Sequence, residues 1–139
     1  MRVIRSGAGG RAIFRRQVAA LDRGMNRAGL LAVGSVKNLI NRGNADGKNP
    51  SAPGEPPKKV SARLFQSITH KLERLPGRRI VKIGTNVKYA RRLELGFYGT
   101  DAAGRTIRQA PRPFLRPGVR RRREQYRILI RNAWKRGGK

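Results

Sequence analysis

The chain has 139 residues, of which 34 are Lys or Arg and only seven are Asp or Glu, so its formal net charge is +27. This length suits one small domain, and so large a positive charge indicates a partner that is a polyanion or an acidic surface. Nucleic acid is the first candidate, an acidic protein the second and an anionic membrane a distant third. The absence of cysteine excludes disulfides and thiolate metal sites, and no apolar run is long enough to span a membrane.

Residues 1–11 are basic and rich in glycine, and we expect them to form a flexible arm before a single domain at 12–136. Apolar residues then recur every three or four positions, which predicts a long amphipathic helix. Its stripe consists of Phe14, Val18, Leu21, Met25, Ala28, Ala32, Val36 and Leu39. Glycines inside this helix weaken it, and we expect a kink or break near Gly29. The stripe is predicted to pack in the core, with a subunit interface as the alternative.

The segment 41–60 is rich in proline and glycine, which excludes helix and strand and predicts a long loop within the domain. It is either a flexible linker or a loop that binds a partner, and Pro53 and Pro56 are its candidate assembly contacts. We expect this loop to become ordered only on docking, because nothing in its sequence can bury itself.

A short helix is predicted next, with Ser61 as a candidate N-cap and with Leu64, Phe65 and Ile68 on one face. Alternating apolar residues on the two sides of a Pro-Gly pair at 76–77 then predict an antiparallel hairpin. The stretch 89–96, YARRLELG, predicts one or two helical turns, and FYGTDAAGRTIRQ at 97–109 predicts a ragged hairpin.

A proline-rich elbow, APRPF at 110–114, precedes the last predicted helix. Prolines fix φ and disfavour helix in the residue before them, so this stretch should be extended. Pro117 then falls in the first turn of the helix, where its missing N–H costs little. Phe114 and Leu115 are left to fill an apolar pocket, either in the protein's own core or on a neighbouring subunit.

Four consecutive arginines follow the elbow and cover one turn of that last helix, so at least one of them should lie near its buried stripe. The stripe is predicted to contain Val119, Tyr126, Ile130 and Ala133. Candidate contacts to DNA or to an acidic neighbour are Arg116, Arg120, Arg121, Arg122, Arg123 and Arg127. With a short basic end at 137–139, the predicted fold is α+β: a long N-terminal helix, a short helix, a small antiparallel β-sheet and a C-terminal helix.

Catalytic chemistry is not predicted. His70 is the single histidine and falls in an alternating pattern typical of an ordinary sheet residue, and the seven acids are scattered. We therefore predict no enzymatic activity, no cofactor and no metal site. Glu94 stands among arginines, and two readings stay open for it: a local ion pair with a residue such as Arg91, or an ion pair between subunits that fixes their register.

Four separate stretches, in chain order, resemble one family. They are SAPGEPP (51–57), SARLFQSI (61–68), KIGTNVKYARRLELG (82–96) and APRPFLRPG (110–118). This ordered set resembles the HK-ninety-seven gp-ten-like neck, or tail-completion, family of tailed bacteriophages, over roughly residues 12–135. Gly118 stands where that family often has Ala. The residues that fall on its motif positions are Tyr89, Glu94, Gly96, Arg112, Pro113, Phe114 and Pro117.

The resemblance implies a structural virion protein at the head–tail junction, made in the host cytoplasm. It would form a ring around the DNA channel, joining the head-closure or connector protein to the tail terminator or tail-tube protein. Glu94, Arg112, Pro113, Phe114 and Leu115 are the candidate assembly residues, together with the loop prolines named above. Double-stranded DNA is the expected polyanion, and no membrane partner is expected.

The charge limits how such a ring could meet DNA. A six-subunit ring would carry about +162, whereas about 40 Å of duplex carries about 24 phosphates. We therefore expect much of the positive surface to meet acidic neighbouring proteins, with a subset facing the channel. Three alternatives remain: a small arginine-rich RNA-binding protein of the ribosomal type, a phage tail terminator, and a DNA-packaging or nucleoid protein.

Overall fold

The structure is a computed structural model that describes residues 8–41, 51–58 and 62–139. Its elements, in chain order, are α1 (Ala8–Asn41), α2 (Ala62–Ser67), β1 (Thr69–Leu75), β2 (Arg78–Gly84), α3 (Ala90–Leu95), β3 (Phe97–Thr100), β4 (Thr106–Gln109), α4 (Leu115–Arg120) and α5 (Arg123–Gly137). This order confirms the predicted α+β class. Residues 8–11 of the expected arm belong to α1. The rest of the arm, most of the 41–60 loop and the N-cap expected at Ser61 lie outside the described residues.

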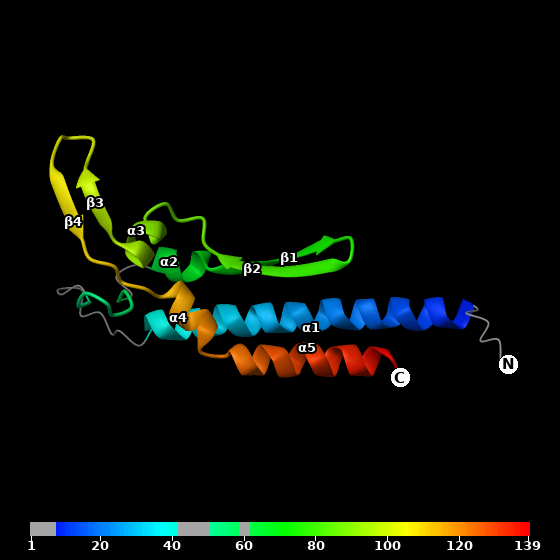
Figure 1. The fold of residues 1–139 in the computed structure, drawn as a ribbon. Coiled ribbons are helices and arrows are strands. Elements are labelled where there is room, and N and C mark those ends of the chain that lie inside the picture. The colour runs from blue at the N-terminus through cyan, green and yellow to red at the C-terminus, as the bar shows by residue number, and fades with distance from the viewer. Residues whose placement is uncertain (1–7, 42–50, 59–61) are drawn as a thin grey trace.

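The elements are arranged along α1 (Figure 1). Helix α5 runs antiparallel beside α1, and the hairpin β1–β2 packs against α1 on another side. The hairpin β3–β4 projects away from α1, near the end at which α1 finishes. Both ends of the described chain, the start of α1 and the end of α5, lie at the opposite end of the molecule.

The buried face of α1 differs from the predicted stripe. Its buried positions include a ridge at strict four-residue intervals: Ala20, Gly24, Ala28, Ala32, Val36 and Ile40. The prediction was right for Ala28, Ala32 and Val36. It was wrong for Phe14, which is 59% exposed, and it missed Ile40, which is 1% exposed. Small side chains along such a ridge allow a neighbouring helix to approach closely, so this face is selected by size rather than by apolar bulk.

The expected kink near Gly29 is absent, because α1 is one helix from its first described turn to Asn41. Close packing against other elements explains how α1 tolerates glycines in its interior. A Cβ on Gly24 would collide with the Cβ of Ala133 on α5, and a Cβ on Gly29 would collide with the imidazole ring of His70 on β1. The two glycines therefore mark the points where α5 and the β1–β2 hairpin come nearest to α1.

The two hairpins form separate two-stranded sheets rather than one small sheet. The predicted turn at Pro76-Gly77 is confirmed, and β1 pairs with β2 from Thr69↔Gly84 to Leu75↔Arg78. His70 pairs with Ile83, as expected for an ordinary sheet residue. The expected ragged hairpin is a regular one, in which β3 pairs with β4 around a turn whose backbone N–H groups donate to the Asp101 carboxylate.

The hydrophobic core lies at one end of α1. It consists of Val36, Ile40, Leu64, Ile68, Val87, Ala90 and Phe114. The other half of α1 contacts α5 and the β1–β2 hairpin mainly through its small residues. The core is therefore small, as the composition predicts, and it includes Ala90 of α3 and Phe114, which directly precedes α4.

The predicted C-terminal helix is divided into two. Helix α4 ends at Arg120, the chain turns at residues 121–122, and α5 begins at Arg123. The break has a geometric reason: α4 crosses α1, whereas α5 runs back along it (Figure 1), and one straight helix could not do both. Pro117 lies in the first turn of α4, where its missing N–H is tolerated as predicted.

Asp22 joins α1 to the far end of the β1–β2 hairpin. Its carboxylate accepts a hydrogen bond from Arg74 Nε at 2.6 Å and another from Arg79 Nε at 2.9 Å, and these two arginines are cross-strand partners. Burial raises the pKa of Asp22, but the hydrogen bonds from the two guanidinium groups outweigh this effect, and the pKa of the carboxyl is lowered below 3.8. The charged carboxylate is therefore the form that the folded state prefers.

We expect Asp22→Asn to reduce the free energy of unfolding at pH 7 by about 1 kcal/mol. A lowered pKa in the folded state stabilises the protein above pH 3.8, and this contribution is lost as the pH falls through the folded-state value. The difference between the variant and the wild type should therefore shrink below about pH 4. Urea unfolding at pH 7 and in acid would measure it; a difference that stays constant across this range would contradict the assignment.

Candidate functional site

The proline-rich elbow adopts the extended conformation predicted for it. Residues 110–114 have no helical or strand structure, and α4 begins immediately afterwards at Leu115. Phe114 is 1% exposed and belongs to the core of its own chain, with Leu115 packed against the same cluster. Of the two places considered for this pair, the structure thus selects the protein's own core.

Glu94 holds the first turn of α4. Its carboxylate accepts hydrogen bonds from the backbone N–H groups of Phe114 at 2.8 Å, Leu115 at 2.9 Å and Arg116 at 2.9 Å. The first N–H groups of a helix have no partner within the helix, and a carboxylate there is favoured both by hydrogen bonding and by the helix dipole. In the described part of the chain Glu94 makes no ion pair, so the first of its two readings, a local ion pair with an arginine such as Arg91, was wrong. The second reading, an ion pair between subunits, stays a prediction.

Backbone contacts fix the elbow from two further sides. The N–H of Arg112 donates to the carbonyl oxygen of Leu93 at 2.6 Å, which ties the elbow to α3. Arg112 also uses its Nε to donate to the carbonyl oxygen of Ser51 at 2.8 Å. Its side chain therefore has a structural partner within the chain. Pro113, beside it, is half-buried.

The described part of the 41–60 loop, residues 51–58, is docked on this elbow. The N–H of Gly54 donates to the carbonyl oxygen of Pro111 at 2.9 Å, and Ser51 is only 4% exposed. The expectation that nothing in the loop can bury itself was thus wrong for this part of it. Its partner is a distant segment of the same chain, which local composition cannot reveal. Pro53 is exposed and Pro56 is half-buried.

We define the clasp as three segments that these contacts bring together: residues 51–57 of the loop, residues 93–96 at the end of α3, and residues 110–118 of the elbow and α4. Gly96 ends α3 with a φ of +76°, where only glycine is unstrained, so the predicted stop is confirmed. A Cβ there would also lie 2.8 Å from the carbonyl oxygen of Gln109. The clasp is thus closed by hydrogen bonds and by a close backbone approach.

Except for Arg116, whose backbone belongs to the clasp, the candidate arginines of the last helix lie outside the clasp, mostly in solvent. Of the four consecutive arginines, Arg122 alone is half-buried, and its Nη1 donates to the Gln125 side chain at 2.8 Å. Arg127 pairs at 3.5 Å with Glu124, but both side chains are more than half exposed, and such a pair contributes little. The turn between α4 and α5 spreads these cations over two helices rather than one helical face.

A second group of cations was not singled out from the sequence. Arg23 and Arg27 on α1, together with Asn132 and Arg136 on α5, line a groove between the two helices. On α1 the sequence does show two arginines four residues apart, one of them next to Gly24. The residues that α5 contributes to the groove depend on how the two helices pair. Sequence alone could not bring these residues together.

Comparison with protein-family models, with curated proteins and with solved structures finds no match to this chain. In the described residues no group of three or more His, Cys, Asp or Glu side chains is placed to hold a metal ion. None of the described helices is long and apolar enough to cross a membrane.

Proposed function

We propose that the chain is a structural protein of a bacteriophage neck, which forms a ring around the DNA channel and joins the head-closure region to the tail. The observation that carries this proposal is the clasp. Three of the four stretches that resemble the neck family meet there, although up to about 60 residues separate them in sequence, as in the contact between Ser51 and Arg112. Stretches that meet and bond to one another are expected of motifs that define one fold.

An accessible apolar surface beside the clasp supports assembly into a ring. A hollow of about 300 Å³ lies between the end of β2, α3 and the start of α4, and its lining includes Val87, Ala90 and Phe114. Leu95 lines the same hollow and is 56% exposed. A large apolar side chain beside an apolar hollow is typical of a surface that a neighbouring subunit covers.

The charge balance supports a polyanionic or acidic environment. The described acids other than Glu55 already have partners: Asp22, Glu73, Asp101 and Glu124 form ion pairs within the chain, and Glu94 caps α4. The Glu55 carboxylate accepts a hydrogen bond from the N–H of Ala52. Most of the cations therefore have no acidic partner in the described part of the chain. A protein with so much uncompensated charge is favoured beside DNA or acidic neighbouring proteins, both of which a neck provides.

Cryo-electron microscopy of purified virions would test the proposal. We expect density for this chain as a ring at the head–tail junction, with Leu95 covered by the adjacent subunit. Absence of the chain from virions, with recovery of the chain in ribosomal particles instead, would reject the proposal in favour of a ribosomal RNA-binding protein. A ring found at the tail-tube end alone would indicate a tail terminator.

A further inference from the structure

The groove between α1 and α5 combines a narrow floor with charged walls. At its floor Gly24 faces Ala133, and a Cβ on Gly24 would collide with that of Ala133. The groove has a volume of about 240 Å³, and its lining residues are Ala20, Arg23, Gly24, Arg27, Leu129, Asn132, Ala133 and Arg136. Because the small residues allow the two helices to approach, long side chains from both helices reach the same hollow.

The three arginines of this groove have no acidic partner. In the described part of the chain Arg23, Arg27 and Arg136 form no ion pair. Asp22 precedes Arg23 in sequence, but both of its carboxylate oxygens accept hydrogen bonds from the β1–β2 hairpin.

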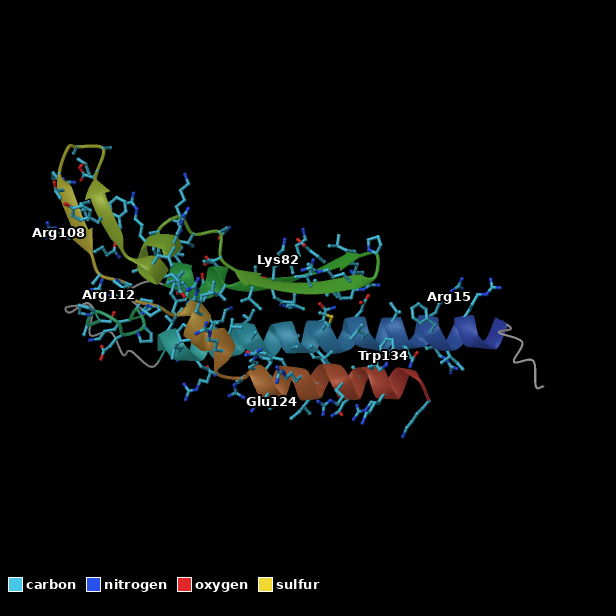
Figure 2. All side chains as sticks on the ribbon, in the orientation of Figure 1. Arg15, Lys82, Arg108, Arg112, Glu124 and Trp134 are labelled. Atoms are coloured by element: carbon cyan, nitrogen blue, oxygen red, sulfur yellow. The ribbon has the colours of Figure 1, made fainter. Side chains whose placement is uncertain are left out.

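The one acid on α5, Glu124, lies beyond one end of the groove. Figure 2 shows Glu124 at the start of α5 and Trp134 towards its other end, two residues before the groove residue Arg136. The 12 residues from Glu124 to Arg136 correspond to about 18 Å along a helix. This exceeds the screening length of about 8 Å at physiological salt, so Glu124 does not compensate the charge of Arg136. The nearer groove residue Leu129 is about 7.5 Å from Glu124 along the helix, but Glu124 is paired with Arg127. With three arginines in its lining, the groove keeps a positive charge.

The chemistry of the lining suits phosphate. Guanidinium groups donate two parallel hydrogen bonds to phosphate oxygens, and the Asn132 amide can donate another. Arg23 and Arg27 are about 6 Å apart along α1. Successive phosphates of one DNA strand advance about 3.4 Å along the duplex axis, so the pair spans about two such steps. Two helices that present cations to one hollow can therefore contact more than one phosphate of a single strand.

We infer that the α1–α5 groove binds backbone phosphates of double-stranded DNA, through Arg23, Arg27 and Arg136. The identification of the phosphate source as DNA rests on the proposed function, whereas the phosphate chemistry rests on the groove itself. The DNA contacts then differ from the arginines at 116–127 that the sequence singled out. Those arginines are left for acidic neighbouring proteins.

The test is DNA binding by the full-length protein, measured by fluorescence anisotropy with a labelled duplex between about 50 and 200 mM salt. The groove variant carries Arg23→Gln, Arg27→Gln and Arg136→Gln. The matched control carries Arg116→Gln, Arg120→Gln and Arg121→Gln, which removes the same charge from exposed positions around α4. We expect the groove variant to bind about 10- to 100-fold more weakly, with a salt slope about 2.7 smaller. The control should stay within about threefold of the wild type.

Equal losses in the two triple variants would overturn the inference, because the effect would then come from net charge alone. A second, milder pair of variants guards against unfolding: Asn132→Asp places one carboxylate in the groove, and Asn86→Asp places one on an exposed loop. We expect only Asn132→Asp to weaken DNA binding, by about tenfold, and equal effects in this pair would also overturn the inference.

Two further arms separate the sources of phosphate. Calorimetric titration of the wild type with inorganic phosphate should show no saturable site. If the wild type has such a site and the groove variant loses it while still binding DNA, the groove binds free anions and the inference is overturned. Tighter binding of an RNA duplex than of DNA would overturn the choice of DNA.

If the chain is found in the neck but the groove variant binds DNA normally, this inference fails alone. If the groove effect holds but the chain is absent from virions, the proposed function fails alone.

Discussion

Gly118→Ala should lower the free energy of unfolding by about 2–3 kcal/mol. A Cβ at this position would lie 2.7 Å from Cγ2 and 2.8 Å from Cα of Val36, which is fully buried. The Cα cannot yield as a flexible side chain would, so α4 would have to move away from α1. That movement would also strain the buried hydrogen bond that Ser35 Oγ donates to the carbonyl oxygen of Gly118, 2.7 Å long. The structure thus explains why glycine suits this position, where α4 and α1 come into close contact.

The matched control is Gly34→Ala, on α1 near this crossing. A Cβ on Gly34 meets nothing within 4 Å. Because alanine has a higher helix propensity than glycine, the substitution should stabilise the protein by about 0.5–1 kcal/mol. Chemical unfolding followed by circular dichroism would measure both variants. If the two substitutions changed stability in the same direction, the close contact between α4 and α1 would be refuted.

Glu94→Ala should destabilise the protein by about 2–4 kcal/mol, because three backbone N–H groups at the start of α4 would lose a charged acceptor. Glu94→Gln should cost less, since one amide oxygen remains to accept. The loss would also loosen the elbow that carries Phe114 into the core. Thermal and urea unfolding would measure the size of the effect for each variant.

Glu124→Gln provides the control for the change of net charge. Glu124 is exposed on α5, and its pair with Arg127 is 3.5 Å long, so its replacement should alter stability by less than about 0.5 kcal/mol. Equal effects at positions 94 and 124 would show that global charge repulsion, and not the cap of α4, determines the result.

The local elements of this fold could be predicted because their signals are local. Proline and glycine at 76–77 set the β1–β2 turn, Gly96 ends α3, and the prolines at 111 and 113 keep the elbow extended. In each case the φ angles available to one or two residues decide the conformation. No partner from elsewhere in the chain is needed.

The partners of these elements could not be predicted in the same way. Glu94 looked like one half of an ion pair because its neighbours in sequence are arginines. Its carboxylate instead accepts hydrogen bonds from backbone N–H groups about 20 residues away. The break between α4 and α5 has no glycine or proline to mark it, since residues 121 and 122 are both arginine. It follows from where α4 crosses α1, which is a tertiary property.

The buried face of α1 shows a further limit of periodicity. A search for bulky apolar residues selects Phe14, which is exposed, and overlooks Gly24, which is buried. Close helix approach requires small side chains, and these carry a weak hydrophobic signal. The α1–α5 groove was missed partly for the same reason, since its floor is this small-residue contact.

The two ends of α1 should differ in how readily they open. Around Ile40 the helix is held by the buried cluster, whereas around Arg16 it is held by a second helix with no fully buried side chain of its own. Amide hydrogens should therefore exchange with solvent more slowly at the first end than at the second, since local opening costs less where fewer contacts must be broken. In the proposed ring, subunits would be fixed to one another at their rigid ends, and the softer helix pairs could adjust individually as the polymer passes.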